Sequence, residues 1–308
     1  MAKRYKCEYM SNNGCIGSCN KEDRLYTTDS DLCAVTASVY DSLPVRCVGQ
    51  WAEQKIYLLV QYFGIFAQGM SKKWKLNYVE ICSGPGRCIN RSDKTEFDGT
   101  ALSVIKREEF KYINKALFFD INDRVVETLN ERFANSGITK AKAYVGDYMS
   151  SETICSVLRQ ELTTDSLNLV VIHPTDCSLP FQMIRDIKAV LPKVDVISNV
   201  AIWTDYNRNV KNTLTKPSNF SKARSKYSTF IGNDRLYDKI TIGMSDLQLR
   251  ERFLSEYKAS FRTEGYSYFD FKIVENFYYI FFASQSDRGI DFWNKATQYE
   301  FDGQGALF

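Results

Sequence analysis

The chain has 308 residues, of which 44% are hydrophobic and 25% charged, and its formal net charge is +3. This composition is globular rather than disordered, the small net charge does not indicate a globally basic nucleic-acid binder, and no apolar run approaches the roughly 20 residues that span a bilayer. Nine cysteines, an odd number, and an N-terminus without an apolar signal core argue against a secreted disulfide framework, so we expect a cytoplasmic protein without a membrane partner.

The first part of the chain, residues 1–47, is rich in cysteine and lacks a sustained hydrophobic period, which sets it apart from a main domain at residues 48–308. Four thiolates match the ligand count of a structural zinc site or an iron–sulfur cluster. The candidate metal ligands are Cys7, Cys15, Cys19 and Cys33. Their spacing lacks the Cys-x-x-Cys pairs of a strong metal motif, so a set of unrelated reduced thiols is an equal alternative.

Regular structure begins with a broad apolar stripe that predicts a helix over residues 51–70. A buried strand over 78–82 follows and leads into a glycine turn at 84–86. The polar stretch 90–99 is predicted as a loop, and a short helix over 100–106 comes after it. This long connection argues against a nicotinamide dehydrogenase, whose glycine turn and acidic residue are only about 20 residues apart.

The middle of the chain alternates strands and helices. Strands are predicted at 116–120, 141–145, 167–172 and 194–203, and helices at 123–136, 151–162, 179–190 and 245–264. Alternation indicates a parallel sheet with right-handed crossovers. An antiparallel hairpin over 266–284 ends the sheet, which is typical of the methyltransferase version of this fold. The sequence therefore predicts an α/β protein with the Rossmann-like fold of class I methyltransferases, plus the small cysteine-rich segment.

The glycine turn has the spacing Glu80-x-x-x-Gly84-x-Gly86, the arrangement by which class I methyltransferases hold S-adenosylmethionine. Ligands of open α/β sheets lie beyond the carboxyl ends of the strands, where Asp120 is placed for ribose hydroxyls and Asp147 for an adenine amino group. Either acid could instead cap the helix that follows it. The predicted cofactor contacts are Glu80, Cys82, Gly84, Pro85, Gly86, Asp120, Ile121, Asp147 and Tyr148.

The single histidine of the chain, His173, comes directly after the fourth strand and stands three residues before Asp176. Methyltransferases place catalytic or substrate-positioning groups at this point, and histidine can act as a general base near neutral pH. We therefore predict His173 and Asp176 as catalytic residues. The alternative is a strand-terminal histidine that is hydrogen-bonded to the backbone.

A basic insertion lies at about 204–245, where eight Lys and Arg stand against two Asp between positions 208 and 239. Such a segment is a candidate surface for nucleic-acid phosphates, and a solvated loop region is the alternative. The predicted phosphate contacts are Arg87, Arg208, Lys211, Lys222, Arg224 and Lys226. Aromatic side chains at Tyr206, Phe220 and Tyr227 either stack on bases or pack inside the domain.

With these motifs the chain resembles the three-Cys-motif partner proteins (TcmP), a family with a methyltransferase-like fold. The resemblance covers about residues 40–300 and is most specific in the turn Gly84-Pro85-Gly86-Arg87 and the run Arg288-Gly289-x-x-Phe292-Trp293. It rests further on Val48-Gly49-Gln50-Trp51 with Lys55, Gly99-Thr100-Ala101-Leu102, Phe119-Asp120-Ile121-Asn122, the segment 173–197, Phe230-Ile231-Gly232 and Phe281-Phe282-Ala283-Ser284.

The chain departs from the family pattern at two places. The family usually has an acid where this chain has His173, and Phe-Ala where it has Cys82-Ser83. The first departure puts an inferred catalytic acid in doubt. The resemblance implies a bacterial mobile-element or defence setting and a protein partner encoded nearby; the cysteines of the family name belong to that partner.

The predicted function is an S-adenosylmethionine-binding methyltransferase that acts on or binds nucleic acid. Two alternatives stay open. A non-catalytic partner or effector subunit on the same fold is favoured by His173 in place of the usual acid. A nucleotide-processing enzyme is the other, because a glycine turn and a ribose-binding acid do not specify the cofactor.

Overall fold

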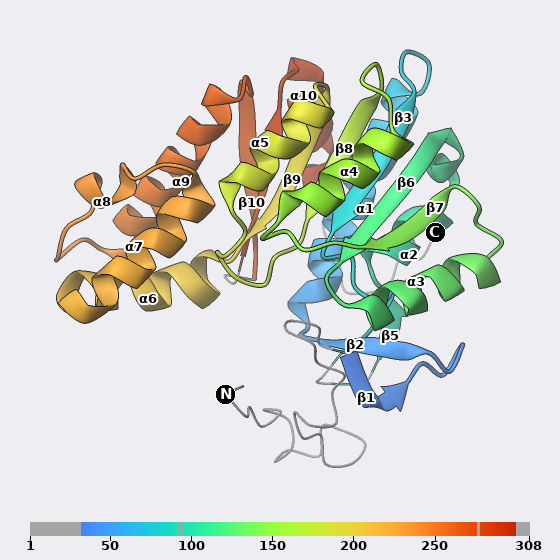
Figure 1. Cartoon of the computed structure of the whole chain (residues 1–308), viewed down its shortest axis with the longest axis horizontal. Coiled ribbons are helices and arrows are strands. Elements are labelled where there is room, and N and C mark those ends of the chain that lie inside the picture. Colours follow the sequence, from blue (N-terminus) through green and yellow to red (C-terminus); the bar gives the residue numbers. More distant parts are fainter. Residues whose placement is uncertain (1–31, 91–92, 94, 276–277, 300–308) are drawn as a thin grey trace.

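The computed structural model describes residues 32–90, 93, 95–275 and 278–299, with the backbone alone at 32–36 and 217–220. Its main feature is a seven-stranded sheet with the order β10-β11-β9-β8-β3-β6-β7 (Figure 1). Strand β11 runs antiparallel to both of its neighbours, and the pairs from β9 to β7 are parallel. The strands are β3 (Leu76–Ile81), β6 (Ile113–Asp120), β7 (Ala141–Val145), β8 (Leu167–Ile172), β9 (Val194–Val200), β10 (Tyr268–Val274) and β11 (Tyr278–Ser284).

This sheet confirms the predicted Rossmann-like α/β fold of the class I methyltransferase type, including its antiparallel final hairpin. The central strands are buried on both faces, so they read as continuous apolar runs. The fifth strand ends earlier than predicted, at Val200. Residues Ile202–Tyr206 form a π-helical turn instead, which redirects the chain into the basic insertion.

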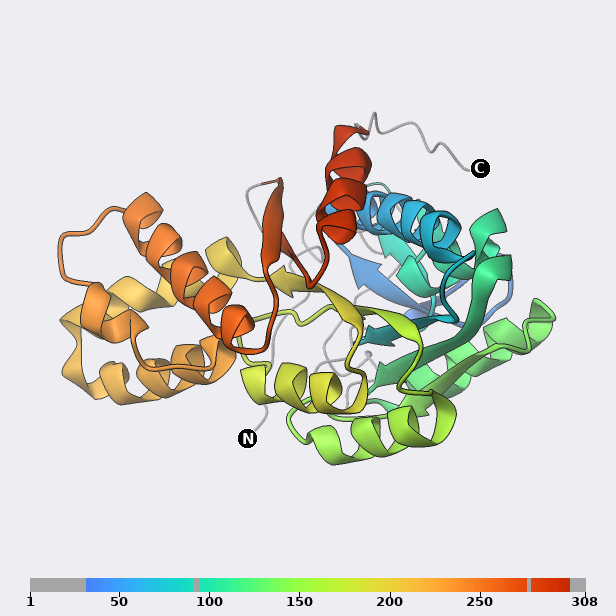
Figure 2. The same cartoon turned by 90° about the horizontal axis from the view of Figure 1, so that it is seen from above.

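Helices cover both faces of the sheet (Figure 2). Alternate side chains of each strand point to opposite faces, so Val79 and Ile81 join the core under one set of helices while Leu76 and Tyr78 join the other. The first set is α4 (Ser151–Glu161) and α5 (Phe181–Val190), and the second is α1 (Trp51–Met70), α2 (Thr100–Lys106), α3 (Asp123–Asn135) and α10 (Asp287–Gln298). A 3₁₀ helix at Glu108–Tyr112 leads into β6.

A second, four-stranded sheet has the order β1-β2-β4-β5 and lies beyond the main sheet next to α3 (Figure 1). Its strands are β1 (Leu32–Ala37), β2 (Pro44–Val48), β4 (Arg87–Asn90) and β5 (Glu96–Asp98). The predicted loop over 90–99 is therefore wrong, since β4 and β5 form a hairpin there. The hairpin is inserted between the glycine turn and α2, and the Gly99 N–H donates to the Gly86 carbonyl where the chain returns.

The predicted boundary at residue 47 falls inside β2, which pairs with β4 of the main domain in parallel. The second strand of the small sheet thus connects the N-terminal part of the chain to the segment that directly follows the glycine turn. Strand β1 completes the sheet on the outer side by pairing antiparallel with β2.

The basic insertion is helical and projects to one side of the sheet (Figures 1 and 2). It contains α6 (Asn207–Thr215), α7 (Pro217–Ile231) and α8 (Leu236–Lys239), and α9 (Asp246–Thr263) packs against it. Tyr206 and Tyr227 are buried there with Phe253 between the helices. Packing, rather than base stacking, is therefore the role of both tyrosines; the side chain of Phe220 lies outside the described part.

None of the helices in the described part of the chain is long and apolar enough to cross a membrane.

Candidate functional site

A pocket of ≈ 380 Å³ opens at the carboxyl edge of the main sheet. Strands β6 and β7 are added on one side of β3, and β8 and β9 on the other, so the topological switch point lies between β3 and β8. The pocket lies there, between Glu80 at the end of β3 and His173 directly after β8. Open α/β sheets bind ligands at this place, and the volume lies within the range of small-molecule sites.

The floor of the pocket is the glycine turn, whose backbone conformation is unusual. Gly84 and Gly86 have φ of 68° and 94°, and Cys82 adopts φ of 64°, in a region that residues with a Cβ rarely enter. The Gly86 position is also crowded, because a Cβ there would lie 2.9 Å from Leu129 and 3.0 Å from Leu102. The turn is therefore held in one conformation by packing as well as by glycine.

Glu80 and His173 both line the inner side of this pocket. Glu80 is fully buried; its Oε2 accepts a 2.8 Å hydrogen bond from the Tyr78 hydroxyl, and its Oε1 lies 3.3 Å from His173 Nε2. Burial raises the pKa of Glu80 to about 8, against the lowering effects of the Tyr78 hydrogen bond and the Lys55 charge. Burial, together with Lys55 and Arg46, holds the pKa of His173 well below its usual value. At neutral pH both side chains are therefore mainly uncharged.

Five buried polar atoms of the pocket lining have no hydrogen-bond partner within the described structure. They are Glu80 Oε1, Ser83 Oγ, His173 Nε2, Asn199 Oδ1 and Thr204 Oγ1. Leaving a buried polar atom unpaired costs about 1–3 kcal/mol, so native interiors rarely contain several together. Their convergence on one pocket indicates a surface that is shaped for a polar ligand.

Three cations also line the pocket: Arg46 from β2, Lys55 from α1 and Arg208 from α6. Burial and the neighbouring Arg46 charge lower the pKa of Lys55 to about 8. Residue patterns alone did not assign Arg46 and Lys55 to the site. The available signal for Lys55 was its place beside Val48-Gly49-Gln50-Trp51 among the residues of the family resemblance.

Asp120 lies outside the pocket lining and supports the glycine turn from below. Its Oδ2 accepts from the Gly84 N–H at 3.1 Å and its Oδ1 from the Asn122 N–H at 3.2 Å. Burial raises the pKa of this carboxyl, while Arg46 and the backbone donors lower it. Asn122, not Asp120, caps α3. Ligand contact by Asp120 therefore stays a prediction.

The predicted adenine contacts also lie outside the pocket lining. The Asp147 carboxylate accepts from the Met149 N–H, and the Tyr148 hydroxyl bonds to Ser178. Ile121, at the end of β6, is 37% exposed. The neighbouring surface is open and apolar, with Val145 and Met149 both exposed, so these residues remain available to a ligand that extends over β6 and β7.

Asp176 is engaged away from the pocket lining. It lies 2.8 Å from Lys226 Nζ, which also contacts Asp205 at 2.7 Å. Asp205 in turn accepts from the Cys177 N–H and from the Tyr227 hydroxyl. This cluster attaches α7 to the loop after β8, and the structure thereby gives both Asp176 and Lys226 anchoring contacts.

The other predicted phosphate contacts differ in their surroundings. Arg208 is exposed and lines the pocket, and Lys222 is exposed on α7. Lys211 is exposed and pairs with Asp246 at 2.5 Å. Arg224 lies over the Tyr237 ring, with 5.7 Å from its guanidinium carbon to the ring centroid.

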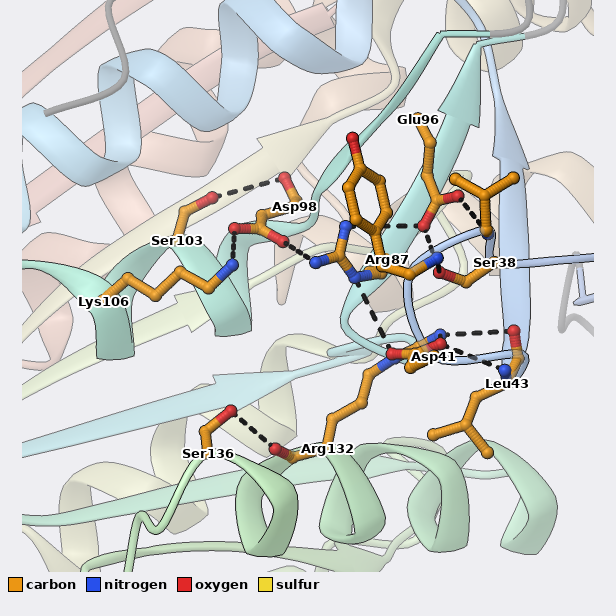
Figure 3. Close-up of polar contacts among 12 residues, drawn as sticks. Ser38, Asp41, Leu43, Arg87, Glu96, Asp98, Ser103, Lys106, Arg132 and Ser136 are labelled. Atoms are coloured by element: carbon orange, nitrogen blue, oxygen red, sulfur yellow. Dashed lines mark hydrogen bonds and ion pairs between the residues drawn. The ribbon is translucent and has the colours of Figure 1, made fainter.

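Arg87 belongs to the ion network of the small sheet rather than to the insertion (Figure 3). It lies 3.4 Å from Glu96, 3.5 Å from Asp98 and 3.8 Å from Asp41. Its guanidinium also stacks on Tyr40. These contacts fix the hairpin β4–β5 against the β1–β2 turn.

Arg132 joins this network at Asp41 (Figure 3), and it also contacts the glycine turn through Pro85. The buried guanidinium donates to both Asp41 oxygens at 2.8 and 3.0 Å, and to the carbonyls of Pro44 at 2.9 Å and Pro85 at 2.6 Å. Partial burial raises the pKa of Asp41, but hydrogen bonds from Arg132 and the Leu43 backbone bring it down to about 2. The small sheet and the pocket floor therefore share one buried cation.

The metal-site prediction falls largely outside the described residues, which exclude Cys7, Cys15 and Cys19. Cys33 is described only by its backbone, as part of β1. Within the described ranges no group of three or more His, Cys, Asp or Glu is placed to hold a metal ion.

We expect Glu80 to make stability depend on pH. Because its folded pKa of about 8 exceeds the ordinary value of 4.5, the folded state binds the extra proton and loses stability as pH rises between them. One such group contributes a slope of up to about 1.4 kcal/mol per pH unit. Glu80→Gln removes this slope. The free energy of unfolding of the variant, measured with urea, should therefore rise relative to that of the wild type from about pH 5 to pH 8.

Asp195 provides the internal check on this prediction. Burial raises the pKa of Asp195 to about 6, although hydrogen bonds from Ser284 and Tyr62 lower it. The titration of Asp195 therefore changes the free energy of unfolding only in the lower half of the window from about pH 5 to pH 8. A difference between Glu80→Gln and wild type that stayed constant above about pH 6.5 would contradict the assignment.

No protein-family model matches the chain, and no curated protein matches it in sequence. Solved structures are similar to the chain at low identity and low TM-score. The plantazolicin methyltransferase BpumL, in complex with S-adenosylhomocysteine, is 11% identical over 81% of this chain and 80% of its own, with a TM-score of 0.37. A putative S-adenosylmethionine-dependent methyltransferase from Methanococcus maripaludis is 14% identical over 77% and 92%, with a TM-score of 0.35.

The bifunctional kinase-methyltransferase WbdD is 15% identical over 49% of this chain, with a TM-score of 0.33. The match spans only 29% of the WbdD chain. Likenesses this distant do not extend to activity, substrate or partners, and the functional assignment depends on the pocket itself.

Proposed function

We propose that the chain is an S-adenosylmethionine-binding methyltransferase whose cofactor occupies the pocket at the switch point. The observation that carries the proposal is the convergence of five unpaired polar atoms on a pocket whose floor is the glycine turn. The strand order, with its antiparallel β11, supports it as the sheet type of this enzyme class.

The lining residues fit the amino-acid end of this cofactor. An ammonium group needs acceptors, which the unpaired oxygens of Glu80 and Asn199 supply, and a carboxylate needs donors or cations, which Ser83 and Lys55 supply. Bound S-adenosylmethionine would provide a methyl group on a positively charged sulfur. Glycine at 84 and 86 allows a ligand to approach the backbone of the turn closely.

His173 is the residue of the pocket best suited to move a proton. Its imidazole is neutral because burial lowers its pKa, and His173 lines the pocket with its Nε2 3.3 Å from Glu80 Oε1. In the tautomer with the proton on Nδ1, Nε2 can accept the proton that an acceptor N–H or O–H releases when it is methylated. Asp176, held by Lys226, is less suited to this role.

The acceptor in this proposal is nucleic acid, which approaches along α6 and α7. The exposed cations Arg208, Lys211 and Lys222 support it, since Arg208 stands at the pocket and the others continue along the two helices. A mobile-element or defence setting with a protein partner belongs to the same proposal through the TcmP resemblance.

Binding of labelled oligonucleotides should weaken with salt if this surface contacts phosphates. Three contacts predict a loss of about 40-fold between roughly 50 and 200 mM salt, because condensed counterions are released on binding. Fluorescence anisotropy across that range measures the slope, and Lys222→Gln should reduce it. An affinity that does not change with salt would contradict the nucleic-acid acceptor.

The nucleotide-processing alternative is favoured by one observation. The lining has three cations and a single acid, Glu80, among its described residues, and phosphates suit such a surface. Preference for a nucleoside triphosphate over S-adenosylmethionine would select this alternative. Cofactor binding without methyl transfer to any acceptor would select the non-catalytic partner subunit.

Calorimetric titration of the protein with S-adenosylmethionine and S-adenosylhomocysteine tests the proposal. We expect micromolar binding in which the ligand ammonium draws Glu80 into its ionised form, so that Glu80→Gln weakens binding by about tenfold through loss of a charge-assisted hydrogen bond. The matched control is Glu127→Gln, the same change at an exposed position of α3. Absence of binding of both compounds to the wild type would overturn the proposal.

A further inference from the structure

The side of the pocket that faces β9 and β11 has an aromatic wall. Trp51, the first residue of α1, and Tyr278, the first residue of β11, both line the pocket and are partly exposed. Their ring centroids lie 6.3 Å apart, with 45° between the ring planes. Because β11 runs antiparallel to β9, its first residue lies at the carboxyl edge of the parallel strands. Two rings from distant parts of the chain therefore meet where the sheet binds ligands.

The Trp51 indole is held in place by the backbone that precedes it. A Cβ at Gly49 would lie 2.0 Å from a carbon of the indole, so glycine at this position leaves room for the ring. The indole also packs at the margin of the core under α1. A flat apolar surface that is fixed before binding loses little conformational entropy when a flat ligand stacks on it.

The segment that follows β9 adds two polar groups to the same pocket. Thr204, in the π-helical turn, has a buried Oγ1 without a hydrogen-bond partner in the described part of the chain. A hydroxyl can donate to or accept from the polar edge of a base. Arg208, four residues later, lines the pocket and is exposed, and a guanidinium suits phosphate. Flat ring, polar edge and phosphate are the three parts of a nucleotide.

The depth of the pocket limits the form in which a nucleotide can react. His173, the proton acceptor of the proposed function, is 8% exposed, and Glu80 beside it is fully buried. A group that is methylated next to His173 must therefore enter the pocket. Bases inside a duplex are stacked and paired, and enzymes that act on a base take it out of the stack. The volume of ≈ 380 Å³ suits a small molecule or a single base rather than a duplex.

We propose that an unpaired nucleobase of the acceptor enters the pocket and stacks on the wall formed by Trp51 and Tyr278, with Thr204 at its polar edge and Arg208 on the adjoining phosphate. The inference rests on the proposed function and narrows its acceptor from nucleic acid in general to an unpaired nucleotide. Every base has a flat face, so the wall selects unpaired bases rather than a sequence. DNA and RNA share this chemistry.

The test is fluorescence anisotropy of wild type, Trp51→Ala, Trp51→Phe and Trp74→Ala with a labelled single strand of about 12 nucleotides, as DNA and as RNA, and with the DNA duplex. Trp74 is the matched control, because it is also partly exposed but lies outside the pocket lining. We expect the single strand to bind about tenfold tighter than the duplex. Trp51→Ala should weaken it by about 5- to 100-fold.

The two remaining variants separate stacking from a loss of structure. Trp51→Phe keeps a ring and should bind within about threefold of the wild type, and Trp74→Ala should bind unchanged. The strand that binds more tightly, DNA or RNA, identifies the source of the base. Equal binding of single strand and duplex, or equal binding by wild type and Trp51→Ala, would overturn the inference.

Calorimetric titration with S-adenosylhomocysteine separates the inference from the proposed function. Single-strand binding that depends on Trp51, in a protein that does not bind S-adenosylhomocysteine, would support the aromatic wall and overturn the methyltransferase proposal. Binding of S-adenosylhomocysteine that Trp51→Ala weakens, with single-strand binding unchanged, would assign the wall to the cofactor and overturn the inference alone.

Discussion

Arg132→Met is expected to lower the free energy of unfolding by about 3–5 kcal/mol, because it removes the buried cation of an ion pair and leaves Asp41 with only the more distant Arg87 guanidinium, at 3.8 Å. The carbonyls of Pro44 and Pro85 lose a donor in the same change. Since Pro85 belongs to the glycine turn, we also expect weaker ligand binding, although the Arg132 guanidinium does not line the pocket. Urea unfolding and calorimetric titration measure the two effects.

The control for this variant is Arg124→Met, on the same helix. Arg124 is exposed, so its replacement should change stability by no more than about 0.5 kcal/mol. Equal destabilisation by the two variants would contradict the role of Arg132 as the link between the small sheet and the glycine turn. So would an Arg132→Met protein with unchanged ligand affinity.

Gly86→Ala is expected to lower the free energy of unfolding by about 2–5 kcal/mol, the sum of left-handed backbone strain and overpacking. The added methyl would approach Leu129 and Leu102 closely, and φ at this position is 94°. Because the turn is the pocket floor, its displacement should also abolish binding of S-adenosylhomocysteine. Thermal unfolding and titration test both results.

Gly137→Ala separates the two contributions. Gly137 also has a positive φ, of 66°, but a Cβ there would meet no described atom within 4 Å. Its replacement should cost only the strain of the left-handed conformation, about 1–2 kcal/mol, with no effect on binding. A Gly86→Ala protein no less stable than Gly137→Ala would show that the turn is not tightly packed.

Local patterns in the sequence were sufficient for most elements of the main sheet. The helix over 51–70 and the strands over 141–145 and 167–172 have the predicted bounds, because helical periodicity and buried apolar runs are properties of neighbouring residues. The small sheet was missed for the opposite reason. Its central pair, β2 and β4, joins segments about forty residues apart, and its strands are short and partly polar.

The candidate site could be predicted in part. Glu80, the glycine turn and His173 meet in one pocket because the carboxyl ends of adjacent parallel strands necessarily lie together. The sequence could not show that the Asp120 carboxylate accepts a hydrogen bond from the Gly84 N–H, or that Asp176 pairs with Lys226. Both contacts depend on loop conformation. Nor could it place Arg46 at the pocket, because that position depends on the small sheet.

The most direct measurement is a crystal structure of the protein with S-adenosylhomocysteine. The methyltransferase proposal predicts the ligand in the pocket between β3 and β8, with its amino-acid end against the glycine turn and Glu80. Five unpaired atoms of the lining should then have partners. A structure in which the compound is absent at saturating concentration, or lies elsewhere on the protein, would contradict the proposal.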